Sequence, residues 1–267
     1  MLTYIKLLSK KSLPAAQIAD FQCHFSNCSV NARQQQAFRK AMQLAPGQSL
    51  PISYEFITAF PYILKVTADK KFAYPALGLI HLSSEFQRHY EFDRSKPFDL
   101  NVNVTQDIEH PKGKLVKMTI EFYQNGERCI TNTNVMLKRQ KTVIDAPKAE
   151  RKKSEFKQQY FLLITHKLAR RYAKVSGDYN PIHLYDCTAK LFGFDRAIIH
   201  GMYLCHRLLL DKKIQSDHCL VSFKKPCKLP QEVGVSHQGN TLRAFSNSDQ
   251  LHMEIELLEQ HIAPELS

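Results

Sequence analysis

The chain has 267 residues, of which 43% are hydrophobic, enough for one large domain or two modest ones around a buried core. No segment approaches the roughly 18 apolar residues of a membrane-spanning helix, and charges at Lys6 and Lys10 leave no room for a signal-peptide apolar region. The seven cysteines include no Cys-x-x-Cys pair, which favours buried free thiols and a reducing, cytoplasmic compartment.

The formal net charge is +12, and the excess is uneven along the chain. Between Lys138 and Lys174, twelve Lys or Arg residues stand against three acidic ones, a local charge of +9. Such a block is typical of a surface that binds a nucleic acid or an anionic carrier, and equally of a solvated linker. Because no stacking aromatics or nucleic-acid motif accompany the charges, nucleic-acid binding is only a remote alternative.

The first half of the chain predicts one helix and an antiparallel sheet. The helix is expected over 56–68, where Pro61 would have to begin or kink it. Strand-like runs follow at 77–86, 98–108, 114–123 and 129–137. In the third run apolar and polar residues alternate, and the pair Asn125-Gly126 behind it is the favoured signal for a two-residue hairpin.

The second half predicts two helices and then short strands. Residues 139–155 are charged and lack apolar periodicity, so they are interpreted as a linker between the halves. A helix is expected over 165–174, and a longer buried one over 198–213, where apolar residues recur every three or four positions. Short strands are expected at 220–223, 228–236, 241–246 and 252–257.

The most informative stretch is 176–183, which reads Ser-Gly-Asp-Tyr-Asn-Pro-Ile-His. Its glycine and its Asn-Pro pair interrupt regular structure, so an irregular turn is expected to direct Asp178 and His183 into one cleft. A neutral histidine beside a partly desolvated carboxylate is an acid–base pair suited to neutral pH. Turn chemistry alone explains Asp-x-Asn-Pro as a capped turn, so a catalytic interpretation depends on His183 and on the helix downstream.

Gly201 lies near the start of that downstream helix. Free backbone N–H groups and the positive end of the helix dipole favour an anion there, and a glycine lets a substrate oxygen approach closely. A small residue that merely permits tight packing is an equal alternative. For His200 and His206, a hydrogen-bonded structural role is the more frequent one.

Taken together, these residues resemble a known family. The stretch 176–183, followed by Ala189, Gly193-Phe194 and the run 199–202, is similar to the signature of the MaoC-like acyl dehydratases, or R-specific enoyl-CoA hydratases. The spacing matches without a gap from Tyr172 to Met202, and 223–230 resembles the family's Phe-x-x-Pro strand.

The resemblance implies the hotdog fold, a long helix wrapped in an antiparallel sheet. Residues 51–60 and 72–81 resemble the degenerate N-terminal hotdog of longer members, which lacks the Asp-x-Asn-Pro-x-His motif. The implied class is α+β, a double hotdog. Its parts are an N-terminal hotdog at 1–138 that binds the acyl chain, the basic linker at 139–155 and a catalytic hotdog at 156–267.

The same resemblance implies a hydro-lyase. It would hydrate trans-2-enoyl thioesters, or dehydrate (R)-3-hydroxyacyl thioesters, of coenzyme A or acyl carrier protein in fatty-acid metabolism. Asp178 and His183 would be the catalytic pair. The Gly201 amide would bind the thioester carbonyl, and Asn180 would orient the turn or the water. The implied substrate-binding residues are Ser176, Pro181, His200 and Met202.

Neither a metal nor a cofactor is expected, other than the coenzyme A or phosphopantetheine of the substrate, since the His and Cys spacings do not argue for a metal. Two hotdogs in one chain satisfy the usual pairing internally or still form a homodimer. The main alternative is a binding protein of the same fold that holds an acyl thioester without turning it over. Retention of both Asp178 and His183 argues against that alternative.

Overall fold

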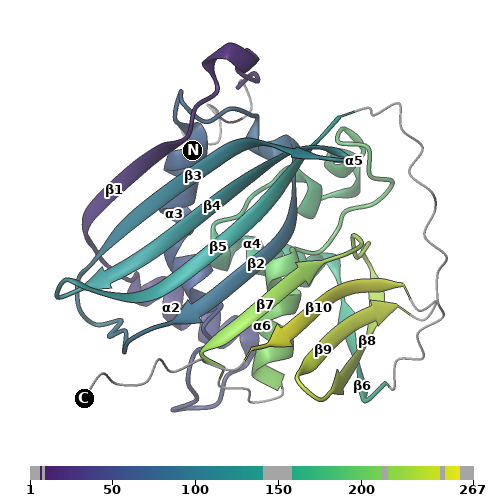
Figure 1. Ribbon diagram of the computed structural model, residues 1–267. Coiled ribbons are helices and arrows are strands. Elements are labelled where there is room, and N and C mark those ends of the chain that lie inside the picture. The colour runs from purple at the N-terminus through teal and green to yellow at the C-terminus, as the bar shows by residue number, and fades with distance from the viewer. Residues whose placement is uncertain (1–6, 8–9, 141–157, 212–215, 247–249, 259–267) are drawn as a thin grey trace.

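The protein is described here by a computed structural model that places residues 7, 10–140, 158–211, 216–246 and 250–258. Apart from positions 139 and 140, the linker predicted at 139–155 lies outside these residues. Ten strands of the described chain form one sheet in the order β1-β3-β4-β5-β2-β7-β10-β9-β8-β6. All of their pairings are antiparallel, and the longer helices lie behind the sheet in Figure 1.

The first half contributes five strands and two α-helices. They are β1 (Phe21–Cys28), α2 (Ala32–Met42), α3 (Tyr54–Ala68), β2 (Leu79–Arg88), β3 (Phe98–His110), β4 (Gly113–Gln124) and β5 (Glu127–Arg139). Short 3-10 turns, η1 (Ala15–Gln17) and η2 (Ala76–Gly78), precede β1 and β2. The four strands predicted in this half correspond to β2, β3, β4 and β5.

The second half repeats the plan with shorter strands. They are β6 (Tyr160–Ile164), β7 (His218–Phe223), β8 (Gln231–Gln238), β9 (Thr241–Ser246) and β10 (Leu251–Leu257). The helical elements are α4 (His166–Ser176), the 3-10 turn η3 (Pro181–His183), α5 (Asp186–Lys190) and α6 (Gly201–Asp211). None of the helices in the described residues is long and apolar enough to cross a membrane.

The alternation seen in the sequence of β4 determines which face of the sheet is buried. Val116 and Met118 are fully buried, whereas Lys117 between them is exposed. Asn125 and Gly126 both have positive φ, 53° and 83°, and close the hairpin between β4 and β5. The predicted strand and its turn are therefore confirmed.

The two halves are joined within the sheet by β2. This strand pairs with β5 on one side and with β7 on the other, where Ser84 lies opposite Val221. Helix α3 contributes to both hydrophobic cores: Ile57 belongs to the core shared with α6, and Phe60 to the core under β3 and β4. A helix against an antiparallel sheet, twice in one chain, is the predicted α+β double hotdog.

The helix predicted over 56–68 is confirmed as α3, which starts at Tyr54 and contains Pro61 in its interior. One predicted helix start was wrong. The helix expected over 198–213 begins only at Gly201, because Ile198 forms an isolated β-bridge with Lys228. The end of that prediction, at 212 and 213, lies outside the described residues.

Candidate active site

The catalytic turn begins where α4 ends. Gly177 adopts a left-handed conformation with φ of 78°, and its N–H donates to the Ala173 carbonyl at 2.9 Å. A residue with a side chain is strained in this conformation, so glycine is the natural end of the helix. The chain then leaves the helix axis, and Asp178 is the first residue beyond that glycine.

Polar groups within the turn hold its shape. The Ser176 hydroxyl donates to the Tyr172 carbonyl at 2.9 Å and accepts the Asp178 N–H at 3.2 Å. The Asp178 carboxylate accepts the Asn180 N–H at 3.1 Å, and the Asn180 side chain accepts the Ile182 N–H at 3.4 Å. The motif therefore supplies its own hydrogen-bond partners, which explains why short polar residues occupy these positions.

Pro181 begins the short turn η3, and this turn brings His183 back toward Asp178. Asp178, His183 and His200 each offer one side-chain atom such that the three atoms lie within 4.8 Å of one another. Both histidines are buried, whereas the Asp178 side chain keeps 26% of its surface exposed. The predicted pair does meet in one place, and a third group, His200, joins it.

The buried imidazole of His183 is held in one tautomer. Its Nδ1 lies 2.9 Å from the carbonyl oxygen of Ile198, which can only accept, so Nδ1 carries the proton and Nε2 is the basic atom. Burial lowers the pKa of His183 below its ordinary 6.5, and the negative charge of Asp178 partly opposes this shift. The ring is therefore neutral at neutral pH and can accept a proton.

His200 supports the pair from the side. Its Nε2–H donates to the backbone carbonyl of Asp178 at 3.0 Å, and its ring stacks on that of His183 with centroids 3.8 Å apart. Burial, followed by the neighbouring His183, lowers the pKa of His200 well below the usual value. Its buried Nδ1 has no hydrogen-bond partner within the described residues, as expected for a neutral ring.

Gly201 is the first residue of α6, so its N–H cannot be satisfied within that helix. A Cβ at this position would lie 2.6 Å from the Phe223 ring, closer than any real contact. Close packing therefore requires glycine here, and the free N–H is a consequence of the position. The structure supports the packing interpretation, and binding of a substrate oxygen by the Gly201 N–H stays a prediction.

The other predicted site residues have mixed surroundings. The side chain of Met202 belongs to the buried core, and the Ser176 hydroxyl is engaged within the turn. Pro181 lies on the turn itself and is only half-buried. Contact with substrate by Ser176, Pro181, His200 and Met202 stays a prediction.

A buried hydrogen-bond chain behind the site was not foreseen. His206 Nε2 lies 3.0 Å from the Tyr172 hydroxyl, and His206 Nδ1 lies 2.8 Å from the Ser53 hydroxyl. The Tyr172 ring meets His200 edge to face, with centroids 4.9 Å apart. Burial lowers the pKa of His206 to about 3, so this histidine is structural. These hydrogen bonds connect Ser53, at the N-terminal end of α3 in the first half of the sequence, to the site in the second half.

The Asp178, His183 and His200 cluster has the ligand types of a zinc site. However, two of its four imidazole nitrogens are hydrogen-bonded to backbone carbonyls, at Ile198 and at Asp178. A metal would have to use the remaining nitrogens and the carboxylate. The arrangement is suited first to holding and deprotonating a water molecule.

Comparisons with known proteins find the family that the sequence motif resembles. Residues 147–250 match the family described as MaoC like domain. The 3-hydroxyacyl-thioester dehydratase X of Mycobacterium tuberculosis is 27% identical over 205 residues, which cover 74% of this chain and 73% of that protein. Residues 147–250 are therefore a MaoC like domain, and the similarity to a named dehydratase supports an enzyme of the hydro-lyase class.

Solved structures show the same fold along most of the chain. A crystal structure of HtdX from Mycobacterium tuberculosis has a TM-score of 0.75 at 23% identity and covers 88% of this chain and 98% of that one. A MaoC-like dehydratase from Phytophthora capsici has a TM-score of 0.60 at 15% identity and covers 94% of this chain and 100% of that one. The predicted hotdog class is thereby confirmed.

Proposed function

We propose that this chain adds water reversibly to trans-2-enoyl thioesters and, in reverse, dehydrates (R)-3-hydroxyacyl thioesters. The observation that carries the proposal is the meeting of the Asp178 carboxylate with the neutral, single-tautomer imidazole of His183. The name of the mycobacterial relative, a 3-hydroxyacyl-thioester dehydratase, supports the same substrate class.

In the hydration direction, the Gly201 N–H would donate to the thioester carbonyl oxygen. That bond strengthens as C3 is attacked and negative charge moves onto the oxygen to give an enolate. Asp178 and His183 would hold a water molecule and remove one of its protons while its oxygen bonds to C3. One of the pair then returns a proton to C2, so that the elements of water are added and no redox partner is needed. Each acid–base group contributes about a hundredfold or more to the rate.

All three catalytic groups come from the second half of the chain, and we assign the first half, residues 1–138, to covering the acyl chain. Phe60 of α3 supports this assignment, because its ring lies 3.7 Å from the point where a Cβ on Gly177 would be. In this proposal the thioester carrier is coenzyme A or acyl carrier protein, the setting is fatty-acid metabolism, and no separate cofactor takes part.

The decisive experiment follows the absorbance of the enoyl-thioester band when the protein meets crotonyl-CoA and a long-chain enoyl-CoA. Loss of the band with the wild-type protein, but not with His183→Ala or Asp178→Asn, would support the proposal. Undiminished activity in Asp178→Asn would contradict the mechanism. Tight binding of both thioesters with a stable band would instead identify a binding protein of this fold.

A further inference from the structure

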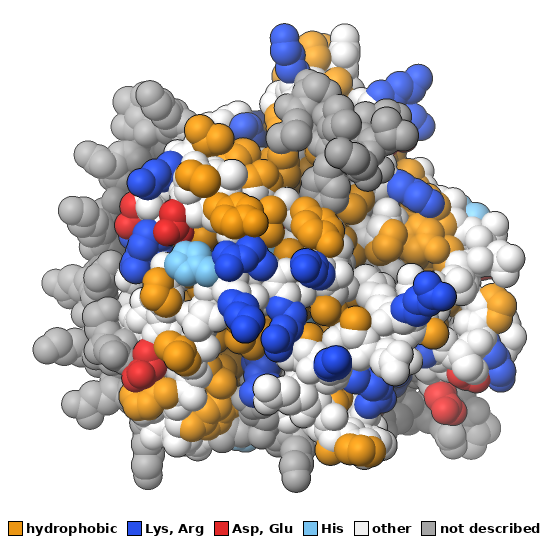
Figure 2. Space-filling model, turned by 180° about the vertical axis from the view of Figure 1, so that it is seen from behind, with side chains coloured by type: hydrophobic (Ala, Val, Ile, Leu, Met, Phe, Trp, Pro, Cys, Tyr) orange, Lys and Arg blue, Asp and Glu red, His pale blue; other side chains and the backbone are white. Residues whose placement is uncertain are grey.

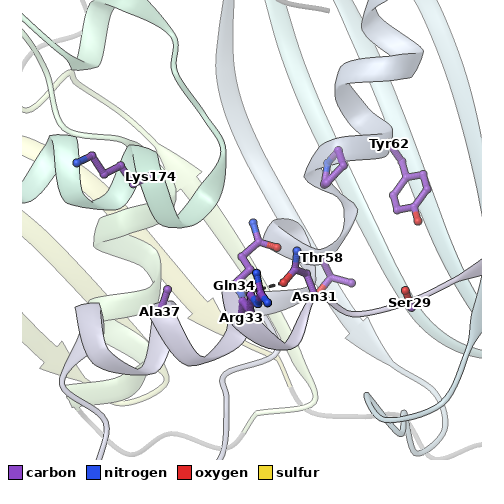
Figure 3. A pocket seen from close by; sticks show the side chains of 9 residues that line it. Ser29, Asn31, Arg33, Gln34, Ala37, Thr58, Tyr62 and Lys174 are labelled. Carbon is purple, nitrogen blue, oxygen red and sulfur yellow. Dashed lines mark hydrogen bonds between the residues drawn. The ribbon is translucent and has the colours of Figure 1, made fainter. Parts of the chain in front are cut away.

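A pocket of about 700 Å³ opens between α2, α3 and α4, beside the catalytic turn. Figure 3 shows Asn31, Arg33 and Gln34 of the α2 end between Lys174 on one side and Thr58 and Tyr62 of α3 on the other. Most of these side chains are polar or cationic. Such a lining does not suit an acyl tail, which would leave the charged and amide groups without partners.

The pocket borders the helix α4 that leads into the catalytic turn. Gln34, which lines the pocket, donates from its side-chain amide to the Val175 carbonyl at 2.9 Å. Lys174 lies on the last turn of α4, four residues before Asp178. A ligand in this pocket therefore lies next to the site without occupying it.

The pocket is positively charged and unneutralised. Figure 3 shows Arg33 beside Gln34, whereas the ammonium group of Lys174 points away from these two side chains. Neither cation has an ion-pair partner within the part of the chain that the structure describes, and no carboxylate lines the pocket. An exposed lysine has a flexible stem and can turn toward an anion.

The helices around the pocket add to its positive charge. The sequences of α2 and α4 contain no Asp or Glu. On α4, Lys167, Arg171 and Lys174 are exposed and follow one face of the helix. Figure 2 shows Lys and Arg side chains gathered across the middle of the helix-covered face of the molecule. An anion approaching the site from this side meets attraction before it reaches the pocket.

We infer that this pocket binds the phosphate end of the pantetheine arm of the thioester; the inference rests on the function proposed above. Arg33 binds the phosphate with its planar fork of N–H donors, a geometry that suits phosphate oxygens. Lys174 adds positive charge, and Gln34 and Asn31 offer amide groups to the arm. The same phosphate occurs in coenzyme A and in the prosthetic group of a carrier protein.

Binding is measured first, without any turnover. Isothermal titration compares 4′-phosphopantetheine with pantetheine, using the wild-type protein, Arg33→Gln and a control variant. The control is Lys112→Gln/Lys117→Gln, which removes two exposed lysines from the turn before β4 and from β4 itself. The phosphate should improve the affinity of wild type and control by about tenfold or more. Arg33→Gln should remove most of that difference. Equal affinity of wild type for both ligands, or an undiminished difference in Arg33→Gln, would overturn the inference.

Kinetics then separate this inference from the proposed function. With crotonyl-pantetheine, which lacks the phosphate, Arg33→Gln should match wild type, whereas with crotonyl-phosphopantetheine its KM should rise about tenfold at unchanged kcat. Absence of turnover with every thioester would reject the proposed function and leave the titration valid. A similar loss in Arg33→Gln on both substrates would reject the pocket.

The carrier is identified by a second pair of cations. Lys167→Gln/Arg171→Gln removes charge from α4 outside the pocket. If the carrier is a protein, its enoyl thioester should lose kcat/KM in this variant while crotonyl-CoA does not. Unchanged kcat/KM with the carrier-protein thioester would point to coenzyme A. Both results are consistent with phosphate binding at Arg33.

Discussion

The imidazole rings of His183 and His200 lie nearly parallel, 3.8 Å apart between centroids and 28° between planes. His200 contacts the site in two further ways: its Nε2–H donates to the Asp178 carbonyl, and its ring meets the Tyr172 ring edge to face. We therefore regard His200 as a positioning residue. It holds the His183 ring by stacking and the Asp178 backbone by a hydrogen bond.

Replacing His200 should lower kcat more than it changes KM. His200→Ala removes the donor to Asp178 and the stacking surface of His183, and we expect kcat to fall about tenfold to a hundredfold. His200→Gln, whose amide can still donate to the Asp178 carbonyl, should retain more activity. Steady-state kinetics with a short enoyl thioester decide this. A His200→Ala enzyme with wild-type kcat would show that the stack is irrelevant to catalysis.

The pH dependence follows from the low pKa of His183. The base must be neutral, so activity falls only when the pH drops through the pKa of His183, which burial holds below 6.5. The acidic limb of the kcat/KM profile should therefore be centred below pH 6.5. An acidic limb centred above that pH would contradict the assignment of His183 as a neutral base.

Asp178 affects that same pKa. Its carboxylate raises the pKa of His183 against the stronger effect of burial. In Asp178→Asn, the pKa of His183 should fall further, which NMR titration of the labelled ring can follow even if the variant is inactive. An unchanged pKa in this variant would mean that the two groups are not electrostatically coupled.

Gly201 and Phe223 should be energetically coupled. Gly201→Ala places a methyl group against the Phe223 ring, and such overpacking costs about 1–3 kcal/mol of the free energy of unfolding. Phe223→Leu makes room for the added methyl group, so the double variant should be more stable than the sum of the two single losses predicts. Thermal unfolding of the two single variants and the double variant measures these losses. Strict additivity would show that the ring does not determine the residue at 201.

The buried ion pair between Glu55 and Arg94 gives a prediction with a defined sign. Glu55 is fully buried in α3, and its carboxylate is bound by Arg94. Burial raises the pKa of Glu55, and the charge of Arg94 opposes that rise. Removing one partner of a buried pair costs about 3–5 kcal/mol, because an uncompensated charge remains.

In Arg94→Gln, the pKa of Glu55 should rise further above its unfolded value. The folded state then binds a proton more tightly than the unfolded state, so the variant becomes more stable, relative to wild type, as the pH falls. The difference in Tm between wild type and Arg94→Gln should be larger at pH 8 than at pH 5. The double variant Glu55→Gln/Arg94→Gln removes the titrating group, so its Tm deficit should not show this trend. Equal deficits for Arg94→Gln at both pH values would contradict the prediction.

The sequence was sufficient for elements with strong local signals. The alternation of β4 and the Asn125-Gly126 turn each depend on neighbouring residues, and both are found as predicted. The meeting of Asp178 and His183 was also predictable, because the Asn-Pro pair forces a turn between them. These features need no information from distant parts of the chain.

What the sequence did not predict depends on long-range packing. Helix α2 buries only Phe38 and Met42 of its eleven residues, which leaves too weak an apolar pattern to predict a helix. The bond from His200 to the Asp178 carbonyl spans 22 residues, and the bond from His206 to Ser53 spans 153. No local spacing specifies such contacts, so the hydrogen-bond partners of His200 and His206 and the pocket beside α2 became visible only in three dimensions, although a structural role for both histidines was expected.

The pairing of β2 with β7 places the seam between the halves inside a single polypeptide. Two hotdogs that meet as separate molecules separate on dilution, but these two are tethered at a fixed stoichiometry. Specific activity should therefore remain constant as the enzyme is diluted, as far as this seam is concerned. The tether also frees the two units from having to be alike: one can keep the Asp-x-Asn-Pro-x-His motif while the other specialises without it.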